Sequence, residues 1–550
     1  MLVCSALAPD GSPVEGFVFD GERTVTYGGS EPVDAGIRLS LALPATEDPS
    51  WLVPGIFYGE NRVEACTRRY PRFTRGRVDI AQMESDAWSF RADRCATAAV
   101  FARGGGLATT ERSPLGQAGV GFALRDGAPT IWLDFPYREE PLRYDGTETP
   151  AAPDVQTHTW QPGERVTLDV EVVGDDWREV LRPRAASVRP AAWVSVHEAA
   201  ELAAHGLYHW HYKPDPARLI ETRSFDAREE RDHMHVSWVS GAPYAYALLR
   251  HGRRVGNDEY VGAAEAVLDH IAGNLAPAGI FWPQWTHDRG WTWGWHHDHR
   301  RAHARTIADA ALFLLRAGGR WEDAARSNVA VALRTQRDDG ALPSALDLQT
   351  GEPLSWDGTA GMSWIPAFVA AGEPDAAHRA GDYYRRFDHW YGAPEDVDLA
   401  PTSEDGYAAV MAFVALEDRE AARRAADWAL TFRYSYDVDF PAGTPLAELG
   451  FKSFGADQAS PPNQHLHCFG LVCLPELVAL GEPYATSALQ HLECFRQCLA
   501  RYDGDFGAFR GMAAERYLQT DCFGPKGSLL AESHAWAVGL VLLACEELLA

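Results

Sequence analysis

The segment WTHDRGWTWGWHHDHR, residues 285–300, mixes aromatic and ionisable side chains at a density typical of neither a packed core nor a solvated surface. It holds four tryptophans, four histidines, two aspartates and two arginines. Indole rings stack on the C–H faces of sugars, and carboxylates, imidazoles and guanidiniums bond sugar hydroxyls. We therefore expect a carbohydrate-contacting segment, although indoles that only pack a loop onto helix ends would give the same composition. The expected contacts are Trp285, Asp288, Arg289, Trp291, Trp293, Trp295, His296 and His297.

The same mixture recurs at four other places, each ahead of an apolar segment. These places are SWDGTAGMSW, PTSEDGY, GADQASPPNQHLH and DCFGPKGSLLAESHAW. Acidic residues before a helix also cap its free N–H groups and meet the positive end of its dipole, so each carboxylate has a structural alternative. The further substrate contacts expected here are Trp356, Asp357, Trp364, Asp405, Tyr407, Gln458, Asn463, Gln464, His465, His467, His534 and Trp536.

Several of these segments carry carboxylates that could cleave a glycosidic bond. Glycoside hydrolysis needs one protonated carboxyl group to donate to the leaving oxygen and a second to activate water or attack the sugar. Glu404 paired with Asp298 or Asp457 is the preferred combination, and Glu532 is the next candidate. The sequence sets no distance between them, so it does not separate a retaining from an inverting reaction.

Residues 224–550 alternate between two kinds of predicted helix. Six segments have a polar, Gly- or His-bearing start followed by an apolar helix, as in TSEDGYAAVMAFVALED and LAESHAWAVGLVLLACEELLA. Five amphipathic segments separate them, and a helix at about 194–205 would complete twelve. Helices buried on most sides are apolar nearly all round, so the alternation predicts a closed (α/α)6 toroid whose polar helix starts converge at one mouth. An irregular helical domain or a solenoid is the alternative.

Residues 1–189 predict an antiparallel β-sandwich, because short alternating runs are bounded by Gly, Pro and Asp. A helical linker over residues 190–223 joins it to the toroid domain. Within the β-region, PGIFYGENRVEACTRRYPRF follows a Pro-Gly turn and could reach over the toroid mouth; a polar hairpin tip is the alternative. The contacts expected from this loop are Tyr58, Glu60 and Arg62.

This layout of β-sandwich, helical linker and (α/α)6 domain resembles the six-hairpin glycosidases over nearly the whole chain. The resemblance rests on architecture and on the sugar-site composition above, with no diagnostic family motif. It implies a glycoside hydrolase for oligosaccharides in polysaccharide degradation, and it favours an inverting reaction. We expect exo action because loops would close the toroid mouth into a pocket, and a hydrolase of this kind could also act on uronic-acid-containing sugars.

Other chemistries fit parts of the pattern. A polysaccharide lyase would use a His or Tyr base with Asn or Arg neutralising a uronate, and a sugar epimerase would use paired histidines. A non-catalytic carbohydrate-binding protein is a further alternative. His299 and His303 have the i, i+4 spacing of a metal pair, but HRRAH lacks the glutamate of HExxH, so no metal is expected.

The net charge, the cysteine count and the absence of certain motifs argue against several classes of protein. A net charge of −27 repels polyphosphates and disfavours nucleic-acid binding. The sequence shows no membrane span, no signal peptide and no phosphate-binding loop, so we expect a cytoplasmic enzyme without a nucleotide cofactor. Nine cysteines without a CxxC pair fit reduced thiols. The expected partner is an oligosaccharide substrate; the oligomeric state, a homodimer included, stays open.

Overall fold

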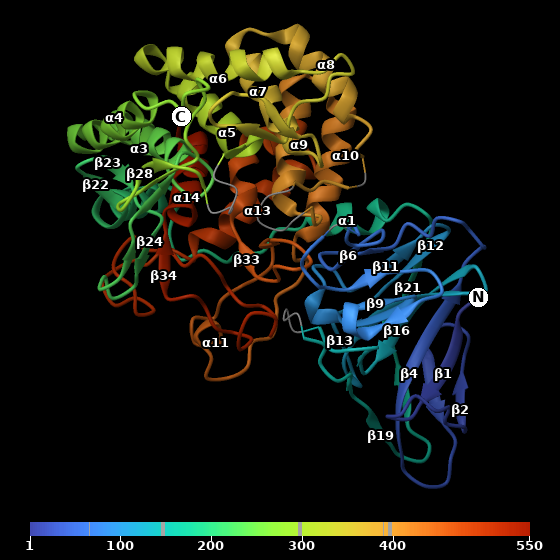
Figure 1. Cartoon of the computed structure of the whole chain (residues 1–550). Coiled ribbons are helices and arrows are strands. Elements are labelled where there is room, and N and C mark those ends of the chain that lie inside the picture. Colours follow the sequence, from blue (N-terminus) through green and yellow to red (C-terminus); the bar gives the residue numbers. More distant parts are fainter. Residues whose placement is uncertain (65, 145–148, 295–299, 389, 394–398) are drawn as a thin grey trace.

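The computed structural model describes residues 1–64, 66–144, 149–294, 300–388, 390–393 and 399–550. Strands dominate its first part, and helices dominate from α2 onward. Figure 1 shows the strand-rich region beside the helical region, with α1 between them. The protein therefore has mixed sheet and helix content, with the helices gathered in the C-terminal part.

The two largest sheets of the N-terminal region are antiparallel. The first has the order β1-β4-β16-β15-β10, and β19 also pairs with β4. The second has the order β21-β12-β11-β5-β6. The first sheet comprises β1 (Val3–Leu7), β4 (Val33–Ala42), β16 (Ala128–Phe135), β15 (Gly119–Arg125), β10 (Ala87–Arg91) and β19 (His158–Trp160). The second comprises β21 (Glu171–Val173), β12 (Gly105–Ala108), β11 (Ala99–Ala102), β5 (Leu52–Val53) and β6 (Phe57–Tyr58).

The two sheets pack face to face through β11 and β12 of one and β15 and β16 of the other. Alternate side chains of each strand point into this interface, so one apolar core fills the space between the sheets. Trp51, Phe57, Trp88 and Phe122 are central to it, and the Trp51 and Phe122 rings stack at 4.5 Å. The space between the sheets is thus a core of its own, whereas other residues of the second sheet, among them Tyr58 and Phe101, belong to the cluster of the helices.

Six inner helices of the described chain form a closed ring. Each contacts the next in the order α3, α5, α7, α9, α12 and α14, and α14 contacts α3 to close the circle. The inner helices were predicted to be buried on most sides, and in α14 every residue from Ala535 to Glu546 is buried. The inner helices are α3 (Ala242–Val255), α5 (Ala304–Ala317), α7 (Trp364–Ala371), α9 (Ser403–Ala415), α12 (Leu474–Leu480) and α14 (Ala535–Leu549).

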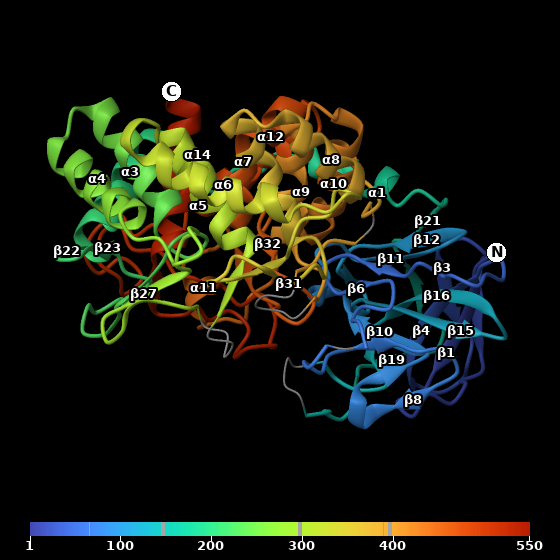
Figure 2. The same cartoon turned by 45° about the horizontal axis from the view of Figure 1, so that its top comes forward.

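An outer helix packs on every inner one. The pairs are α3 with α4, α5 with α6, α7 with α8, α9 with α10, α12 with α13, and α14 with α2. The helix expected at 194–205 is α2, and it supplies the twelfth position by packing on the last inner helix. Figure 2 shows these helices gathered on the side of the molecule opposite the N-terminus. The outer helices are α4 (Asp258–Ala272), α6 (Glu322–Thr335), α8 (Pro374–Tyr384), α10 (Arg419–Ala429), α13 (Tyr484–Arg496) and α2 (Val196–Gly206).

Short strands lead into several inner helices and fix their first residues. β29 (Arg301–His303) runs directly into α5, and β34 (Glu532–His534) runs directly into α14. β33 (Leu466–His467) precedes the 3-10 turn Phe469–Cys473, which continues as α12. The last residue of each strand is a buried histidine, as it is in β26 (His233–His235) ahead of α3. The repeat thus places an imidazole at the same structural position in four of its units.

The segment expected to be a helical linker has a more mixed structure. α2 accounts for only part of residues 190–223, and the rest includes β22 (Tyr212–Pro214), β23 (Ala217–Leu219) and most of β24 (Thr222–Ser224). β24 pairs with β34, so the end of this segment joins the last inner helix start rather than spanning between domains. None of the helices in the described part of the chain is long and apolar enough to cross a membrane.

Candidate active site

A cavity of about 340 Å³ opens among the starts of the inner helices. Its walls come from the residues before α3, from α9, from the segment that leads into α12, and from the strands around β34. Charged and polar side chains mix there with aromatic rings, as in small-molecule sites. The residues around it are Glu221, Arg231, Trp238, Val239, Glu404, Ala459, Asn463, His465, His467, Phe469, Glu515, Arg516, Leu530, Glu532, His534 and Trp536.

Glu404, in the first turn of α9, is held from two other inner-helix starts. The guanidinium of Arg305 on α5 donates to its Oε2 at 2.7 Å, and the indole N–H of Trp238 donates to the same oxygen at 2.8 Å. In the ring order α3 lies opposite α9, so the Trp238 contact spans the mouth of the toroid. Two donors on one oxygen orient the carboxylate and stabilise its ionised form.

Trp238 adopts a backbone conformation that few non-glycine residues adopt. Its φ is 68°, in the left-handed region, which is costly for a bulky side chain and persists only where surrounding contacts enforce it. The Tyr244 hydroxyl donates to the Trp238 carbonyl, and the Arg305 guanidinium stacks at 4.5 Å from the indole centroid. These contacts hold the indole beside Glu404 and supply an aromatic wall to the cavity.

A second group of charges surrounds His534, the N-cap residue of α14. Its Nε2 lies 3.4 Å from Glu515 and 4.0 Å from Glu532. Glu221 lies nearby and accepts a hydrogen bond from Arg231 at 2.7 Å. Burial by itself raises the pKa of Glu221, but His235, His534 and Arg231 outweigh it and lower that pKa to about 2. Glu221 is therefore an ionised carboxylate at neutral pH.

The histidines of the cavity are neutral at neutral pH. Burial lowers the pKa of His467 to about 4 and lowers the pKa of His465 well below its usual value. Burial also lowers the pKa of His534, against the opposing effect of Glu515 and Glu221. Neutral imidazoles can accept as well as donate a proton, which suits them to acid and base roles.

The β-domain anchors the segment that carries part of this cavity. Asp521 lies 3.0 Å from Arg91 and 2.9 Å from Arg94, two residues at the end of β10 and just beyond it. Lys526 lies 2.8 Å from Asp93. Because Asp521 and Lys526 stand midway between Glu515 and Glu532 in the chain, these ion pairs fix the segment at its centre.

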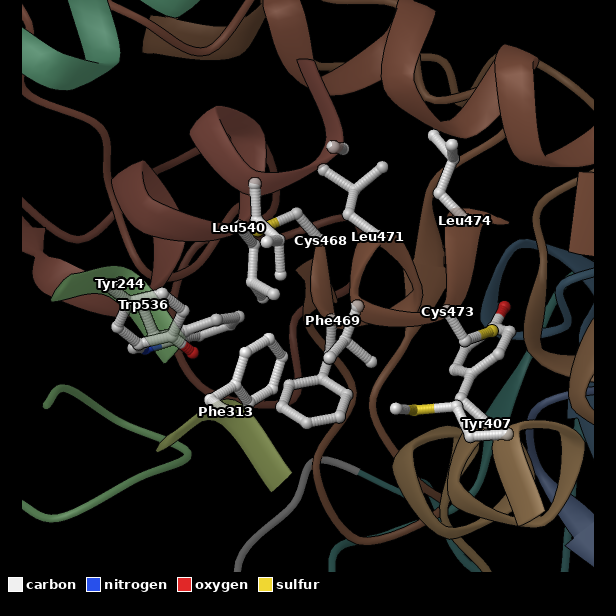
Figure 3. Packing of buried hydrophobic residues seen from close by; sticks show 14 of the residues in the cluster. Tyr244, Phe313, Tyr407, Cys468, Phe469, Leu471, Cys473, Leu474, Trp536 and Leu540 are labelled. Atoms are coloured by element: carbon white, nitrogen blue, oxygen red, sulfur yellow. The ribbon is translucent and has the colours of Figure 1, made fainter. Parts of the chain in front are cut away.

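Seven of the residues predicted from the sequence meet in this cavity: Glu404, Asn463, His465, His467, Glu532, His534 and Trp536. Phe469 joins Trp536 at a ring distance of 6.5 Å. Figure 3 shows Phe469 between Trp536 on one side and Tyr407 on the other, among the buried apolar residues. Composition at the helix starts therefore predicted about half of the cavity wall.

Asp457 and Tyr407 lie behind the cavity rather than in it. Asp457 is 0% exposed, and Arg433 donates to its Oδ1 at 2.8 Å. The Tyr407 hydroxyl donates to Asp457 Oδ2 at 2.7 Å. Fully paired in this way, Asp457 ties β32 (Asp457–Gln458) to α9, and a catalytic role for it does not fit its place. Gln458 is likewise buried and donates to the carbonyl of Gly55 in the β-domain.

The tryptophan-rich segment packs on an outer helix over its described part. Trp285 and Trp291 face each other across the hairpin of β27 (Gln284–Thr286) and β28 (Gly290–Thr292). The His270 ring of α4 lies 4.9 Å from the Trp291 ring, and Arg218 stacks at 4.5 Å on Trp285. These two indoles therefore hold the hairpin in place, the structural alternative in the sequence analysis. Asp288, Arg289 and Trp293 of the same hairpin do not line the cavity either.

The other residues predicted to contact substrate lie outside the cavity wall or outside the described residues. Asp405 is buried beside the α9 N-cap, where Thr402 Oγ1 donates to it at 2.8 Å. Trp364 is wholly buried and stacks on Phe368. Asp357 is exposed and accepts from Ser355. Trp356 and Gln464 also lie outside the cavity wall, whereas Asp298, Trp295, His296 and His297 fall outside the described residues.

The loop of the β-domain does reach toward the cavity, but through a different residue. Tyr58 is buried, stacks on Phe432 at 4.8 Å and shares a hydrogen bond with Thr431, so it connects the strand-rich region with the helical region. Arg62 donates to backbone carbonyls within its own domain, and Glu60 is 70% exposed. Arg68 instead donates to Asn463 Oδ1 at 3.2 Å, so this arginine connects the loop with the cavity wall.

Sequence reasoning missed Glu221, Arg231, Trp238, Phe469, Glu515 and Arg516. Trp238 carried a usable signal, because it lies in the segment just ahead of the apolar α3, and Trp536 lies in the first turn of the apolar α14. Glu221 and Glu515 lie in irregular stretches without such a pattern. Only the pairing of β24 with β34 brings Glu221 to the cavity, and that pairing joins residues about 310 apart in the chain.

Comparison with known proteins gives only distant similarity. No family model matches the chain, and no curated protein matches it either. Among solved structures, a D-mannose isomerase is 12% identical over 64% of this chain and 96% of its own, with a TM-score of 0.44. A cellobiose 2-epimerase from Spirochaeta thermophila is 13% identical over 64% and 96%, with a TM-score of 0.42. A polysaccharide lyase is 10% identical over 99% and 91%, with a TM-score of 0.44. Likeness at this level does not assign an activity.

Proposed function

We propose that the protein is a carbohydrate-active enzyme and that it hydrolyses a glycosidic bond in the cavity at the toroid mouth. One observation carries the proposal: carboxylates from two separate elements meet in a cavity that also has indole and phenyl walls. Glu404 comes from α9, whereas Glu515 and Glu532 come from the segment before α14. Hydrolysis of an acetal needs two carboxyl groups on different sides of the bond, and this arrangement can supply them.

Glu404 takes the role of base or nucleophile. Arg305 and Trp238 both donate to its Oε2, so the ionised form is stabilised and the carboxylate is fixed in one orientation. The carboxylate would remove a proton from water or attack the anomeric carbon. The positively charged Arg305 beside it also opposes protonation.

Glu532 takes the role of the proton donor to the leaving oxygen. It is 40% exposed, which gives it access to solvent protons between turnovers. His534 Nε2 at 4.0 Å and the other carboxylates of the cavity form its surroundings.

A cavity of about 340 Å³ is at the small end of ligand sites and fits the end of a saccharide rather than a long chain segment. We therefore propose exo action, in which the terminal unit stacks against Trp238 or Trp536. Inversion or retention depends on the separation of Glu404 and Glu532 when substrate is bound.

Proton transfer at a sugar C–H bond is a second candidate, favoured by the histidines. His467 and His534 are buried and neutral at neutral pH, and the His467 and Trp536 rings lie 5.9 Å apart. Two such imidazoles could remove and return a proton during epimerisation or isomerisation. Elimination by a tyrosine base is less well supported, since Tyr407 is bonded to Asp457 outside the cavity.

A product screen with the purified protein separates these reactions. Oligosaccharides incubated in D2O should release a reducing sugar without deuterium on carbon if the reaction is hydrolysis. Glu404→Gln should lower the rate by about 10²–10⁴-fold, because it removes the base but keeps the side-chain shape. Deuterium on carbon without bond cleavage would replace hydrolysis by epimerisation, and the histidine variants would then be the ones to lose activity.

A further inference from the structure

Two histidines lie together on the outer side of α2 and of the turn that continues it. His205 is in the last turn of α2, and His209 is in the π-helical turn Leu207–His211. Residues four apart lie on the same face of a helix, and the ring centroids of these two imidazoles are 4.1 Å apart. By comparison, the His465 and His467 rings of the cavity wall are 5.9 Å apart. The pair on α2 is therefore in direct ring contact.

The ring nitrogens of this pair are available to a ligand. Neither imidazole makes a hydrogen bond or an ion pair with the described part of the chain, and the ring contacts are between the two histidines and with Tyr208, which lies edge-on to His209 at 5.0 Å. His209 is exposed, and both nitrogens of the half-buried His205 have access to solvent. Dissolved ions can therefore reach both rings.

His205 is neutral at neutral pH. Partial burial is the largest effect on it, followed by His209 and Arg510, and together they lower the pKa of His205 to about 4 against the opposing effect of Asp503. A neutral imidazole has a lone pair on one ring nitrogen, and this is the form that binds metal ions. A proton on one ring disfavours a proton on the other, whereas a single metal ion can be bound by both rings.

We infer that His205 and His209 together bind one divalent transition-metal ion. Histidines four residues apart are the pair with which a helix presents two imidazoles to zinc, and imidazole nitrogen suits zinc, copper and nickel better than magnesium or calcium. No third histidine, cysteine or carboxylate completes a three-residue group with them among the described residues, so water supplies the other ligands. Neither histidine lines the cavity, so the site does not depend on the reaction proposed there.

The ion has a structural role, because it links α2 with a turn that reaches toward the cavity. The turn is π-helical, a conformation that is rare and usually limited to one turn. His211, two residues after His209, donates from Nδ1 to the Ile220 carbonyl at 3.0 Å, and its Nε2 lies 3.0 Å from Ser533 Oγ. Ile220 and Ser533 each adjoin a residue of the cavity wall in the chain. The expected effect of the ion is therefore on stability.

Calorimetric titration of the EDTA-treated protein with ZnCl2 and NiCl2 at about pH 7.5 tests the site. Histidines elsewhere in the chain can also bind these ions, so the comparison is between variants. His209→Ala should bind one equivalent fewer than the wild type, or bind it about tenfold or more weakly, because the second imidazole no longer acts as an intramolecular ligand. His197→Ala, at an exposed position two turns earlier on α2, is the matched control and should bind as the wild type does.

Two further measurements locate the ion. ZnCl2 should raise the thermal midpoint of the wild type and of His197→Ala more than that of His209→Ala, because an ion bound only by the folded state stabilises it; MgCl2 should not. An anomalous-difference map of zinc-soaked crystals should have a peak between the rings of His205 and His209. Equal stoichiometry and affinity in the wild type and His209→Ala, equal shifts of the midpoint, or no peak at that position would overturn the inference and leave the pair as an ordinary aromatic contact.

Discussion

Replacement of Asp309 by asparagine should stabilise the protein, and more so at high pH. Asp309 lies one helical turn after Arg305 on α5, but the Arg305 guanidinium is directed to Glu404 and Asp405 instead. No hydrogen bond or ion pair reaches the Asp309 carboxylate from the described residues. Burial, opposed by Arg305 and Arg316 and reinforced by Asp405 and Glu404, raises the pKa of Asp309 from 3.8 to about 7.

The raised pKa fixes the sign and size of the effect. Below pH 3.8 the carboxyl is protonated in both states and costs nothing. Between pH 3.8 and about 7 the unfolded chain releases the proton while the folded protein retains it, so the destabilisation grows over this range and is fully present above it. A shift of about three units corresponds to about 4 kcal/mol. The side chain keeps partial exposure, so solvent screening reduces this, and we expect about 2 kcal/mol.

Urea unfolding at about pH 5 and about pH 8.5 measures this effect. Asp309→Asn should raise the free energy of unfolding at the higher pH and have a smaller effect at the lower one. Asp338→Asn, in an exposed loop, is the matched control and should change neither. Equal effects of Asp309→Asn at both pH values, or a loss of stability at the higher pH, would refute the reasoning about an uncompensated carboxylate in the toroid.

Three other substitutions test separate contacts. Gly470→Ala should destabilise the fold by about 1–3 kcal/mol, because its methyl group would lie 2.7 Å from Asp457 Oδ2 and 2.8 Å from Tyr407; an unchanged thermal midpoint would contradict this packing. Asp521→Asn should raise KM more than it lowers kcat, since it frees the centre of the segment that carries Glu515 and Glu532 from Arg91 and Arg94; a pure kcat effect would argue against that role. Glu221→Gln should destabilise the protein above about pH 4.5 and progressively less toward pH 2, because the folded pKa of Glu221 is lowered to about 2; urea unfolding across that range checks it, and a pH-independent difference would contradict the ion pairing.

The helical half of the fold could be predicted from sequence because its repeat is visible in hydrophobicity. Inner helices such as α14 are buried nearly all round, whereas outer helices such as α10 are strongly amphipathic. The hydrophobic pattern of each helix therefore predicts whether it lies in the inner or the outer ring. Closure of the ring through α14 and α3, and the pairing of α2 with α14, are contacts between distant parts of the chain. The sequence could predict these two contacts only from the number of predicted helices, because twelve helices complete a closed ring of six pairs.

The candidate site could be predicted only where local sequence carries the signal. Glu404, His534 and Trp536 stand at the polar start of an apolar helix, a pattern readable in one window. The same pattern occurs at Asp457, where a buried ion pair with Arg433 uses the carboxylate for structure. A single sequence window does not distinguish a carboxylate that lines the cavity from one used for structure. The difference depends on whether a cation from a distant part of the chain pairs with the carboxylate.

A high local density of tryptophans did not predict which tryptophans lie at the cavity. Trp285 and Trp291 pack on α4, while Trp238, a single tryptophan in its segment, spans the toroid mouth to Glu404. Indoles are large enough to be needed in cores as well as at sugar sites. Position relative to an inner-helix start was the more informative property.

The most direct test of the central claim is the fate of oxygen in the reaction. An oligosaccharide substrate that releases a sugar would be incubated with the protein in ¹⁸O-labelled water, and the released sugar analysed by mass spectrometry alongside the Glu404→Gln variant. Carboxylate-catalysed hydrolysis predicts one heavy oxygen at the newly formed reducing end and a rate about 10²–10⁴-fold lower for the variant. Sugar release without the label, or at an unchanged rate in Glu404→Gln, would contradict the account.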